Sequence, residues 1–223
     1  MESESEPKQF EKQYVQDVYN QIAHSFDNTR GRNYWNAVNF FIQKIPDKPI
    51  KILDLGCGNG KYIPLFKPSN QIIGLDNSTE LLKILSSRYP HVQTYNSDVT
   101  STNLESNSFD HIISIAVIHH LHTEERRIQM IQEIYRLLKV KGTGFITAWA
   151  TTALSSKFIS ITGFSSCYDY LVPWDNNLNR FYHLFQSNEF EDLIEKAGLD
   201  EKLSILFKIF EYDNYAIEIK KLC

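Results

Sequence analysis

The apolar positions along this chain recur with two different periods. Between Gln13 and Phe26 they fall three or four residues apart, which predicts an amphipathic helix, and the same spacing predicts a second helix from Tyr34 to Ile45. Further along, short continuous apolar runs predict buried strands, and helical stretches separate them. The predicted strands are 51–55, 71–75, 92–95, 109–117 and 144–150, and the predicted helices are 78–89, 123–138 and 188–197.

This alternation predicts an α/β fold. Strands that are apolar throughout are buried on both faces, so we expect a doubly wound, mostly parallel sheet. The last two apolar runs, Lys202–Phe210 and Tyr215–Ile219, are joined by a short polar turn and predict an antiparallel C-terminal hairpin. With the hairpin the sheet has seven strands.

A single domain is expected over residues 13–223. Residues 1–12 are rich in Ser and Glu, which predicts a disordered acidic lead. Residues 151–187 show no clear period, and we interpret them as a lid or substrate-binding region.

Composition narrows the possible partners. A net charge of −4 argues against a protein that holds nucleic acid by a general positive field, although a local basic patch stays compatible with it. No apolar run is long enough to span a bilayer, and the N-terminus lacks the features of a signal peptide, so no membrane partner is expected. The cysteines Cys57, Cys167 and Cys223 lack metal-ligand spacing; they predict free thiols, no metal site and a cytoplasmic location.

A glycine-rich turn follows the first predicted strand. It carries Gly56, Gly58 and Gly60 behind the acidic Asp54, and it is expected to open a helix. Asp76, followed by Asn77, ends the second strand, where a carboxylate accepts hydrogen bonds from ribose hydroxyls. Asp98 and Val99 end the third strand and are the candidates for adenine.

The position of Asp54 discriminates between cofactors. A dinucleotide loop holds a pyrophosphate, which this carboxylate would repel. S-adenosylmethionine (SAM) has no phosphate and is cationic at sulfur. The alternative is a tight turn without a ligand. The loop resembles the first motif of class I SAM-dependent methyltransferases, which have a Rossmann-like fold, and the resemblance implies SAM as cofactor and S-adenosylhomocysteine as product. Tyr14 is then a candidate cover of the cofactor, and Ala116 and His119 are expected near the sulfonium.

Further segments narrow the resemblance. Tyr14–Ala23, Ile113–His120 and Arg180–Phe185, with Gly58–Tyr62, resemble the eukaryotic tRNA wobble-uridine methyltransferase family. The resemblance covers nearly the whole chain and implies esterification of the carboxylate of 5-carboxymethyluridine in the tRNA anticodon loop. It also implies a heterodimer with a small zinc-binding activator subunit, for which 92–95 is the predicted edge strand. Only residues 175–180 stand where many relatives carry a long basic insert.

A carboxylate acceptor is already a nucleophile at neutral pH, so it needs alignment and partial neutralisation rather than a general base. The candidate residues for this role, or for neighbouring phosphates, are Arg30, His120, Arg126, Arg180 and His183. Each also has a purely structural interpretation, as a surface ion pair or as packing.

Two other functions fit the same fold. A methyltransferase acting on a quinone or lipid precursor is expected to have an apolar acceptor pocket and no need for Arg30 or Arg180. A catalytically silent, tRNA-binding subunit is expected to have a damaged cofactor site, and the intact glycines and carboxylates argue against it.

Overall fold

A computed structural model describes residues 6–31, 33–161, 166–175 and 178–223. Its centre is a seven-stranded sheet in the order β3-β2-β1-β4-β5-β10-β9. The parallel strands are β1 (Lys51–Leu55), β2 (Gln71–Asp76), β3 (Gln93–Asn96), β4 (Phe109–Ile115) and β5 (Leu138–Trp149). Strands β9 (Leu203–Glu211) and β10 (Asn214–Lys221) form the hairpin, and β10 is antiparallel to β5. The predicted fold class is confirmed.

Helices cover both faces of the sheet because the central strands are apolar on both sides. One core lies between the sheet and helices α5 (Glu124–Leu137) and α6 (Glu189–Lys196). The other lies between the sheet and helices α3 (Asn36–Lys44) and α4 (Thr79–Arg88). Alternate residues of one strand serve the two cores, as Ile112 and Ile113 show. Ser78 caps α4 and Thr123 caps α5, each by accepting a backbone N–H of the first turn.

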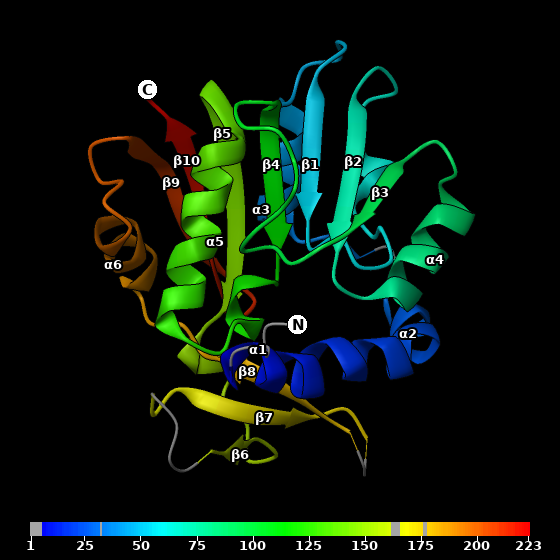
Figure 1. Ribbon diagram of the computed structural model, residues 1–223, viewed down its shortest axis with the longest axis vertical. Coiled ribbons are helices and arrows are strands. Elements are labelled where there is room, and N and C mark those ends of the chain that lie inside the picture. The colour runs from blue at the N-terminus through cyan, green and yellow to red at the C-terminus, as the bar shows by residue number, and fades with distance from the viewer. Residues whose placement is uncertain (1–5, 32, 162–165, 176–177) are drawn as a thin grey trace.

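The N-terminal residues are helical rather than disordered from Glu6 onward. Helix α1 (Glu6–Glu11), the π-helical turn η1 (Lys12–Gln16) and helix α2 (Asp17–Thr29) form one run that crosses beneath the carboxyl ends of the parallel strands (Figure 1). For residues 6–12 this corrects the predicted lead. Burial of Glu11 and the ring stacking of Phe10 on His122 at 4.1 Å hold this segment down.

The predicted lid region folds into a second, antiparallel sheet. Its strands are β6 (Ile159–Ser160), β7 (Asp169–Pro173) and β8 (Asn179–His183), in the order β6-β7-β8. The N-terminal helices lie between this small sheet and the large one (Figure 1). Residues 162–165 and 176–177 of the predicted lid are outside the described residues.

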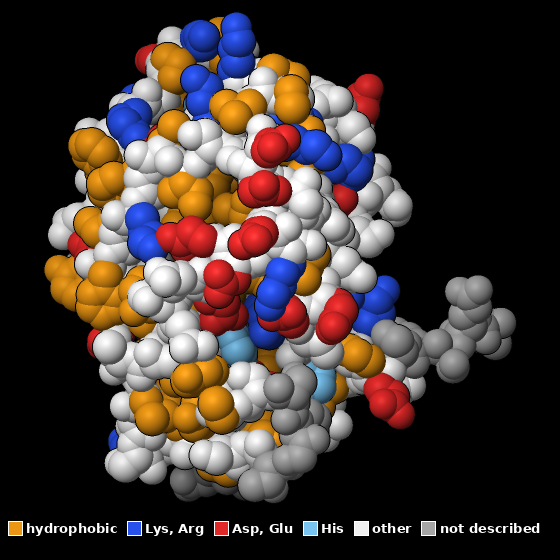
Figure 2. Space-filling model, turned by 90° about the vertical axis from the view of Figure 1, so that its left-hand side faces the viewer, with side chains coloured by type: hydrophobic (Ala, Val, Ile, Leu, Met, Phe, Trp, Pro, Cys, Tyr) orange, Lys and Arg blue, Asp and Glu red, His pale blue; other side chains and the backbone are white. Residues whose placement is uncertain are grey.

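The face that carries α6 and β9 has no field of a single sign. Acidic and basic side chains are interspersed across it, and apolar side chains gather along one border (Figure 2). The exposed apolar residues of β9 are Ile205, Leu206, Phe207 and Phe210.

Candidate active site

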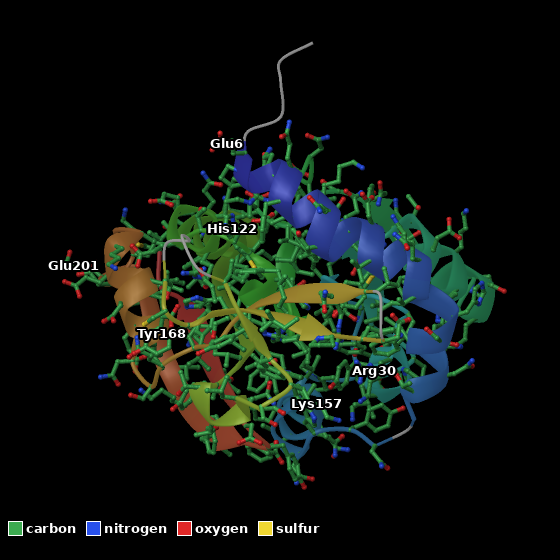
Figure 3. The ribbon with its side chains drawn as sticks, turned by 90° about the horizontal axis from the view of Figure 1, so that it is seen from below. Glu6, Arg30, His122, Lys157, Tyr168 and Glu201 are labelled. Atoms are coloured by element: carbon green, nitrogen blue, oxygen red, sulfur yellow. The ribbon has the colours of Figure 1, made fainter. Side chains whose placement is uncertain are left out.

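A cavity of about 250 Å³ opens at the carboxyl ends of β1, β2 and β4. Its walls come from the glycine loop, the ends of β2 and β4 and the turn after β4, and the N-terminal helices contribute Glu11, Val15 and Tyr19. Seen from below, these helices run along one side of the molecule from Glu6 to near Arg30, beside the strands of the small sheet (Figure 3). Such a crevice outside the strand ends is where open α/β sheets bind ligands.

The glycine loop follows β1, and at Gly56 its backbone has a conformation that only glycine accommodates. Gly56 has φ +83°, and a Cβ there would lie 2.3 Å from Cγ2 of Val117. Gly58 donates its N–H to Oδ2 of Asp76 at 2.8 Å, which ties the loop to β2. Gly60 helps to form the turn but does not line the cavity.

The expected helix after this loop is replaced by a single 3₁₀ turn, η2 (Ile63–Leu65). Pro64 and Pro68 interrupt the short segment before β2, and a proline inside a helix removes a backbone donor and clashes with the preceding turn. The loop is thus held by strand ends and by Asp76, without an α-helix behind it.

Two carboxyl groups lie in the cavity wall beside the loop, those of the buried Asp54 and the half-buried Asp76. Burial, and secondarily the charge of Asp76, raises the pKa of Asp54 to about 8, and Oδ2 of Asp54 has no hydrogen-bond partner. Burial also raises the pKa of Asp76, which accepts the backbone N–H groups of Gly58 and Ser78 at 2.8 Å each. An unpartnered buried carboxyl oxygen is the group that an ammonium or a sulfonium would stabilise.

At the other end of the cavity, Asp98 is held by several donors. Oδ1 accepts the backbone N–H and the hydroxyl of Thr100, at 2.9 and 2.8 Å, and Oδ2 accepts Nη2 of Arg126 at 2.8 Å. Burial alone would raise the pKa of Asp98, but these hydrogen bonds lower it, so the group is a carboxylate. Val99 and Asn77 line the cavity on either side of this end of the sheet.

The hydrogen bonds and the burial of Arg126 do not fit the role at the methyl acceptor that was expected for this residue. Its Nε donates to both carboxylate oxygens of Glu11, at 2.7 and 2.8 Å, and its side chain is 7% exposed. The cation is therefore committed to Glu11 and Asp98, at the predicted adenine end.

His119 presents an N–H without a partner. Its Nδ1 accepts the backbone N–H of Trp149 at 3.1 Å, while Nε2 is buried without a hydrogen-bond partner. Burial lowers the pKa of His119 well below its ordinary value, so the ring is neutral and its single proton sits on Nε2. The ring stacks on Tyr182 with 4.8 Å between centroids and lines the cavity next to Ala116, whose φ is +60°.

His120 has the opposite tautomer. Its Nδ1 lies 2.7 Å from the carbonyl oxygen of Phe181, which only accepts, so Nδ1 carries the proton. Burial lowers the pKa of His120 to about 3. The bare Nε2 accepts the hydroxyl proton of Tyr19 at 3.0 Å, and the oxygen of Tyr19 is then left to accept from Tyr182 at 3.5 Å. Both nitrogens of His120 are thus occupied.

Two cations meet at the outer wall of the cavity. Arg30 lies 4.1 Å above the ring of Phe26, and burial together with the charge of Arg30 lowers the pKa of Lys61. The depressed pKa of one cation beside another marks a place that favours an anion.

Three side chains predicted for the site lie outside the cavity lining. Tyr14 packs on Phe10 at 4.7 Å, whereas Val15 and Tyr19 face the cavity. Arg180 stacks over Trp174 at 4.9 Å and over Tyr182 at 5.3 Å, behind the lining.

The third, His183, is enclosed in an ion network. Its Nδ1 and Nε2 lie 2.6 Å from Asp169 and 2.7 Å from Glu189. Burial alone would lower the pKa of His183, but the hydrogen bonds to the two carboxylates raise it above its ordinary value. Neither ring nitrogen is left for a substrate.

Several lining residues were not predicted. Their sequence signals were present but weak: Tyr19 lies on the apolar face of a predicted helix, and Lys61 is part of the glycine-loop segment. The unpredicted lining residues include Glu11, Tyr19, Phe26, Lys61 and Trp149.

By chemical type, the lining residues thus form an acidic half and a half that offers donors and cations. Asp54, Asp76 and Asp98 suit a cationic nucleoside without phosphate, and the orphaned oxygen of Asp54 fits the cationic end of SAM. His119, Arg30 and Lys61 suit an anionic second ligand. Among the described residues no cluster of three or more His, Cys, Asp or Glu side chains is arranged to bind a metal ion, and no helix there has the length and apolarity to cross a membrane.

Comparison with known sequences identifies relatives of this chain. Residues 53–146 match the family model described as a methyltransferase domain. A Schizosaccharomyces pombe tRNA (carboxymethyluridine(34)-5-O)-methyltransferase is 34% identical over 96% of this chain and 98% of its own length. An Arabidopsis thaliana protein of the same name is 40% identical over 68% of this chain, which spans 39% of that longer protein.

Solved structures share the fold. A Burkholderia thailandensis 1,6-didemethyltoxoflavin-N1-methyltransferase with bound S-adenosylhomocysteine has a TM-score of 0.71 at 15% identity, covering 98% of this chain and 92% of that one. A chain from a Haloferax volcanii complex of the Trm112 methyltransferase activator and a methyltransferase also has a TM-score of 0.71, at 14% identity over 94% of this chain and 98% of that chain.

Proposed function

Since this chain belongs to the tRNA (carboxymethyluridine(34)-5-O)-methyltransferase family, we propose that it esterifies the carboxylate of 5-carboxymethyluridine at the tRNA wobble position, with S-adenosylhomocysteine as the second product. It is a SAM-dependent O-methyltransferase. The observation that supports the choice of acceptor most strongly is that one cavity is lined by carboxylates and also by Arg30, Lys61 and the N–H of His119.

The acidic half would hold SAM, which supplies an electrophilic methyl group. Asp54, with Gly56 and Gly58, faces the methionine end, where a cation relieves the cost of its buried charge. Asp76 and Asn77 would receive the ribose hydroxyls, and Asp98 with Val99 the adenine.

The donor half would receive the acceptor carboxylate. His119 offers a neutral N–H that is held in its tautomer by the backbone of Trp149. Arg30 and Lys61 supply the positive charge that the carboxylate needs close to Asp54 and Asp76. His120 holds Tyr19 in place rather than contacting the acceptor.

No proton has to be removed from the acceptor, and the two neutral histidines fit that requirement. Burial keeps His119 and His120 uncharged at neutral pH, and neither has a carboxylate partner of the kind that makes histidine a general base. The residues contribute by aligning the carboxylate with the methyl group and excluding water.

The first test is methyl transfer from labelled SAM into bulk tRNA from cells that lack this enzyme. We expect incorporation that is released by mild alkali, as an ester is. Binding of SAM without any incorporation, with the activator present, would refute the acceptor.

We further propose that the chain acts as a heterodimer with a small zinc-binding activator. Strand β3 is an edge of the large sheet, as predicted, and Asn96 at its end donates to the carbonyl oxygens of Asp76 and Asn77, at 3.1 and 3.0 Å. A partner strand on β3 would thus stabilise the loop that faces the ribose. That a Haloferax volcanii chain of the same fold was solved in complex with an activator supports the heterodimer.

Each alternative function has a distinguishing outcome. A quinone or lipid methyltransferase predicts that Arg30→Ala and Lys61→Ala leave turnover unchanged, because an apolar acceptor needs no cation. A silent subunit predicts that SAM does not bind at all. The acidic half of the cavity, complete in Asp54, Asp76 and Asp98, argues against the second alternative.

A further inference from the structure

Glu11 is buried although it lies at the end of a short helix on the surface of the molecule. Its relative exposure is 9%, and burial raises the pKa of its carboxyl group. A buried carboxylate needs compensation. Apart from Phe10, the residues around it are polar, so the sequence of the helix alone does not account for the burial of a carboxyl group.

The compensation comes from the opposite wall of the cavity. Glu11 accepts Nε of Arg126 at both oxygens, at 2.7 and 2.8 Å, and the backbone N–H of His122 at 2.8 Å. The same guanidinium reaches Asp98 through Nη2 at 2.8 Å and the hydroxyl of Thr100 through Nη1 at 3.1 Å. A planar guanidinium that is hydrogen-bonded at all three nitrogens is fixed in orientation.

Glu11 is therefore linked to Asp98 through one rigid group. Arg126 is 7% exposed while Asp98 is 26% exposed, and the exposed part of Asp98 borders the cavity. With Oδ1 held by Thr100 and Oδ2 by Arg126, the carboxylate has one orientation toward the cavity. An acceptor with a fixed orientation discriminates between a ligand that donates there and one that does not.

The ion pair between Glu11 and Arg126 also holds the N-terminal helices over the cavity. Helix α1 continues without interruption through the π-helical turn to α2, and this run supplies Val15 and Tyr19 to the lining. Phe10, next to Glu11, stacks on His122 and meets Phe181 edge-on at 5.4 Å. If Glu11 were detached from Arg126, α1 would lose this ion pair together with the ring contacts of Phe10, and the adenine end of the cavity would open.

We propose that Glu11 is a positioning residue with two effects. It holds the N-terminal helix over the cofactor, and through Arg126 it orients Asp98 to accept the amino group of adenine. The proposal rests on the proposed cofactor site, not on the identity of the methyl acceptor. Binding of the nucleoside and docking of the N-terminal helix then stabilise each other, because both favour the same orientation of Asp98 and the same position of α1.

Glu11→Gln is the sharpest variant because it keeps the shape and removes the charge. Its control is Asp17→Asn, which removes a carboxylate from an ion pair with Lys12 that is 44% and 51% exposed on the same helical run. We expect Glu11→Gln to weaken S-adenosylhomocysteine binding by about tenfold and to speed its dissociation, as loss of a buried charged hydrogen bond does, and the control to change less than about twofold. Calorimetry and stopped-flow fluorescence measure both quantities, and unchanged affinity in Glu11→Gln would overturn the proposal.

A second readout separates positioning from general damage. Wild type should prefer S-adenosylhomocysteine to its 6-oxo analogue S-inosylhomocysteine, which has no amino group to donate. Glu11→Gln should lose part of that preference, and in an Asp98→Asn background it should have a smaller effect than in wild type. If the preference is intact, or if the two substitutions are additive, Glu11 does not act through Asp98. Neither result depends on whether tRNA is methylated.

Discussion

The carboxyl group of Asp54 lies buried beside that of Asp76 with one oxygen unpartnered, so its ionisation is coupled to the ligand. Its pKa of about 8 means that the free protein holds this proton at neutral pH. Because the pKa is raised in the folded state, Asp54 lowers the stability of the free protein as the pH rises from the ordinary carboxyl range toward 8. A cationic ligand favours the ionised form.

We expect the affinity for SAM to increase with pH up to about 8, with one proton released on binding and a gain of up to about tenfold per pH unit. Calorimetry in buffers of different ionisation enthalpy measures both quantities. In Asp54→Asn this part of the pH dependence should vanish, while titration of the ligand's own amino group persists. An identical profile in both proteins would mean that Asp54 is already ionised.

His119 is the second residue whose environment predicts a measurable role. Its Nε2–H has no protein partner, so His119→Phe removes a free donor, and it also removes the Nδ1 that accepts the backbone N–H of Trp149. We expect kcat/KM for tRNA to fall by about tenfold or more, because a hydrogen bond to a charged group is lost, with SAM affinity nearly unchanged. His91→Gln, at an exposed histidine, is the control. A fall in SAM affinity instead would place His119 in the cofactor half.

Residue roles were the least predictable part of the sequence. Arg126 and His183 were both expected near the acceptor, but each is held by two carboxylates. Asp98 and Glu11 lie 28 and 115 positions from Arg126, whereas Asp169 and Glu189 lie only 14 and 6 positions from His183. Glu11 pairs with Arg126 across 115 positions, a separation that no local pattern encodes. The carboxylates at the strand ends were predictable because strand position alone determines which edge of the sheet they occupy.

At the scale of elements, burial on both faces made the parallel strands predictable, whereas the small sheet was missed. Strands β7 and β8 lack a clear alternation because their exposure pattern is set by packing against other elements as well as by solvent. The helix expected after Gly60 failed for a local reason, the prolines at 64 and 68. The glycine loop itself followed from the sequence.

The close approach between the glycine loop and the turn after β4 makes a prediction for Gly56. Ala at this position needs φ near +83° and would clash with Val117 at 2.3 Å. We expect Gly56→Ala to lower the melting temperature by about 4 °C or more and to abolish SAM binding. Gly31→Ala, where nothing lies within 4 Å, should leave both unchanged. Thermal shift with and without S-adenosylhomocysteine measures the pair, and a stable, cofactor-binding Gly56→Ala would mean that the loop tolerates a Cβ against Val117.

At the scale of the whole molecule, the large sheet ends in two different edges. Strand β9 exposes apolar side chains such as Leu206, which is 50% exposed, whereas β3 is short and polar. No residue of β9 lines the described cavity, but β3 contacts the ribose-facing loop through Asn96. A partner that activates the enzyme is therefore expected on β3 rather than on the more apolar edge, because only there does it reach the cofactor site.

The direction in which the backbone N–H groups of β3 point provides a test of whether the partner binds β3 or β9. Ser97 donates its N–H to Asp76, so Tyr95 and Gln93 also face β2, and the N–H of Thr94 points outward. Thr94→Pro then removes a donor needed by an added strand without breaking the β2–β3 ladder. We expect it to weaken activator binding by about tenfold or more and to leave the melting temperature of the isolated chain within a few degrees. Leu206→Lys, on the opposite edge, should bind the activator as wild type does. If Leu206→Lys loses the activator while Thr94→Pro retains it, the partner binds β9, and its effect on catalysis must then reach the cavity through β10 and β5.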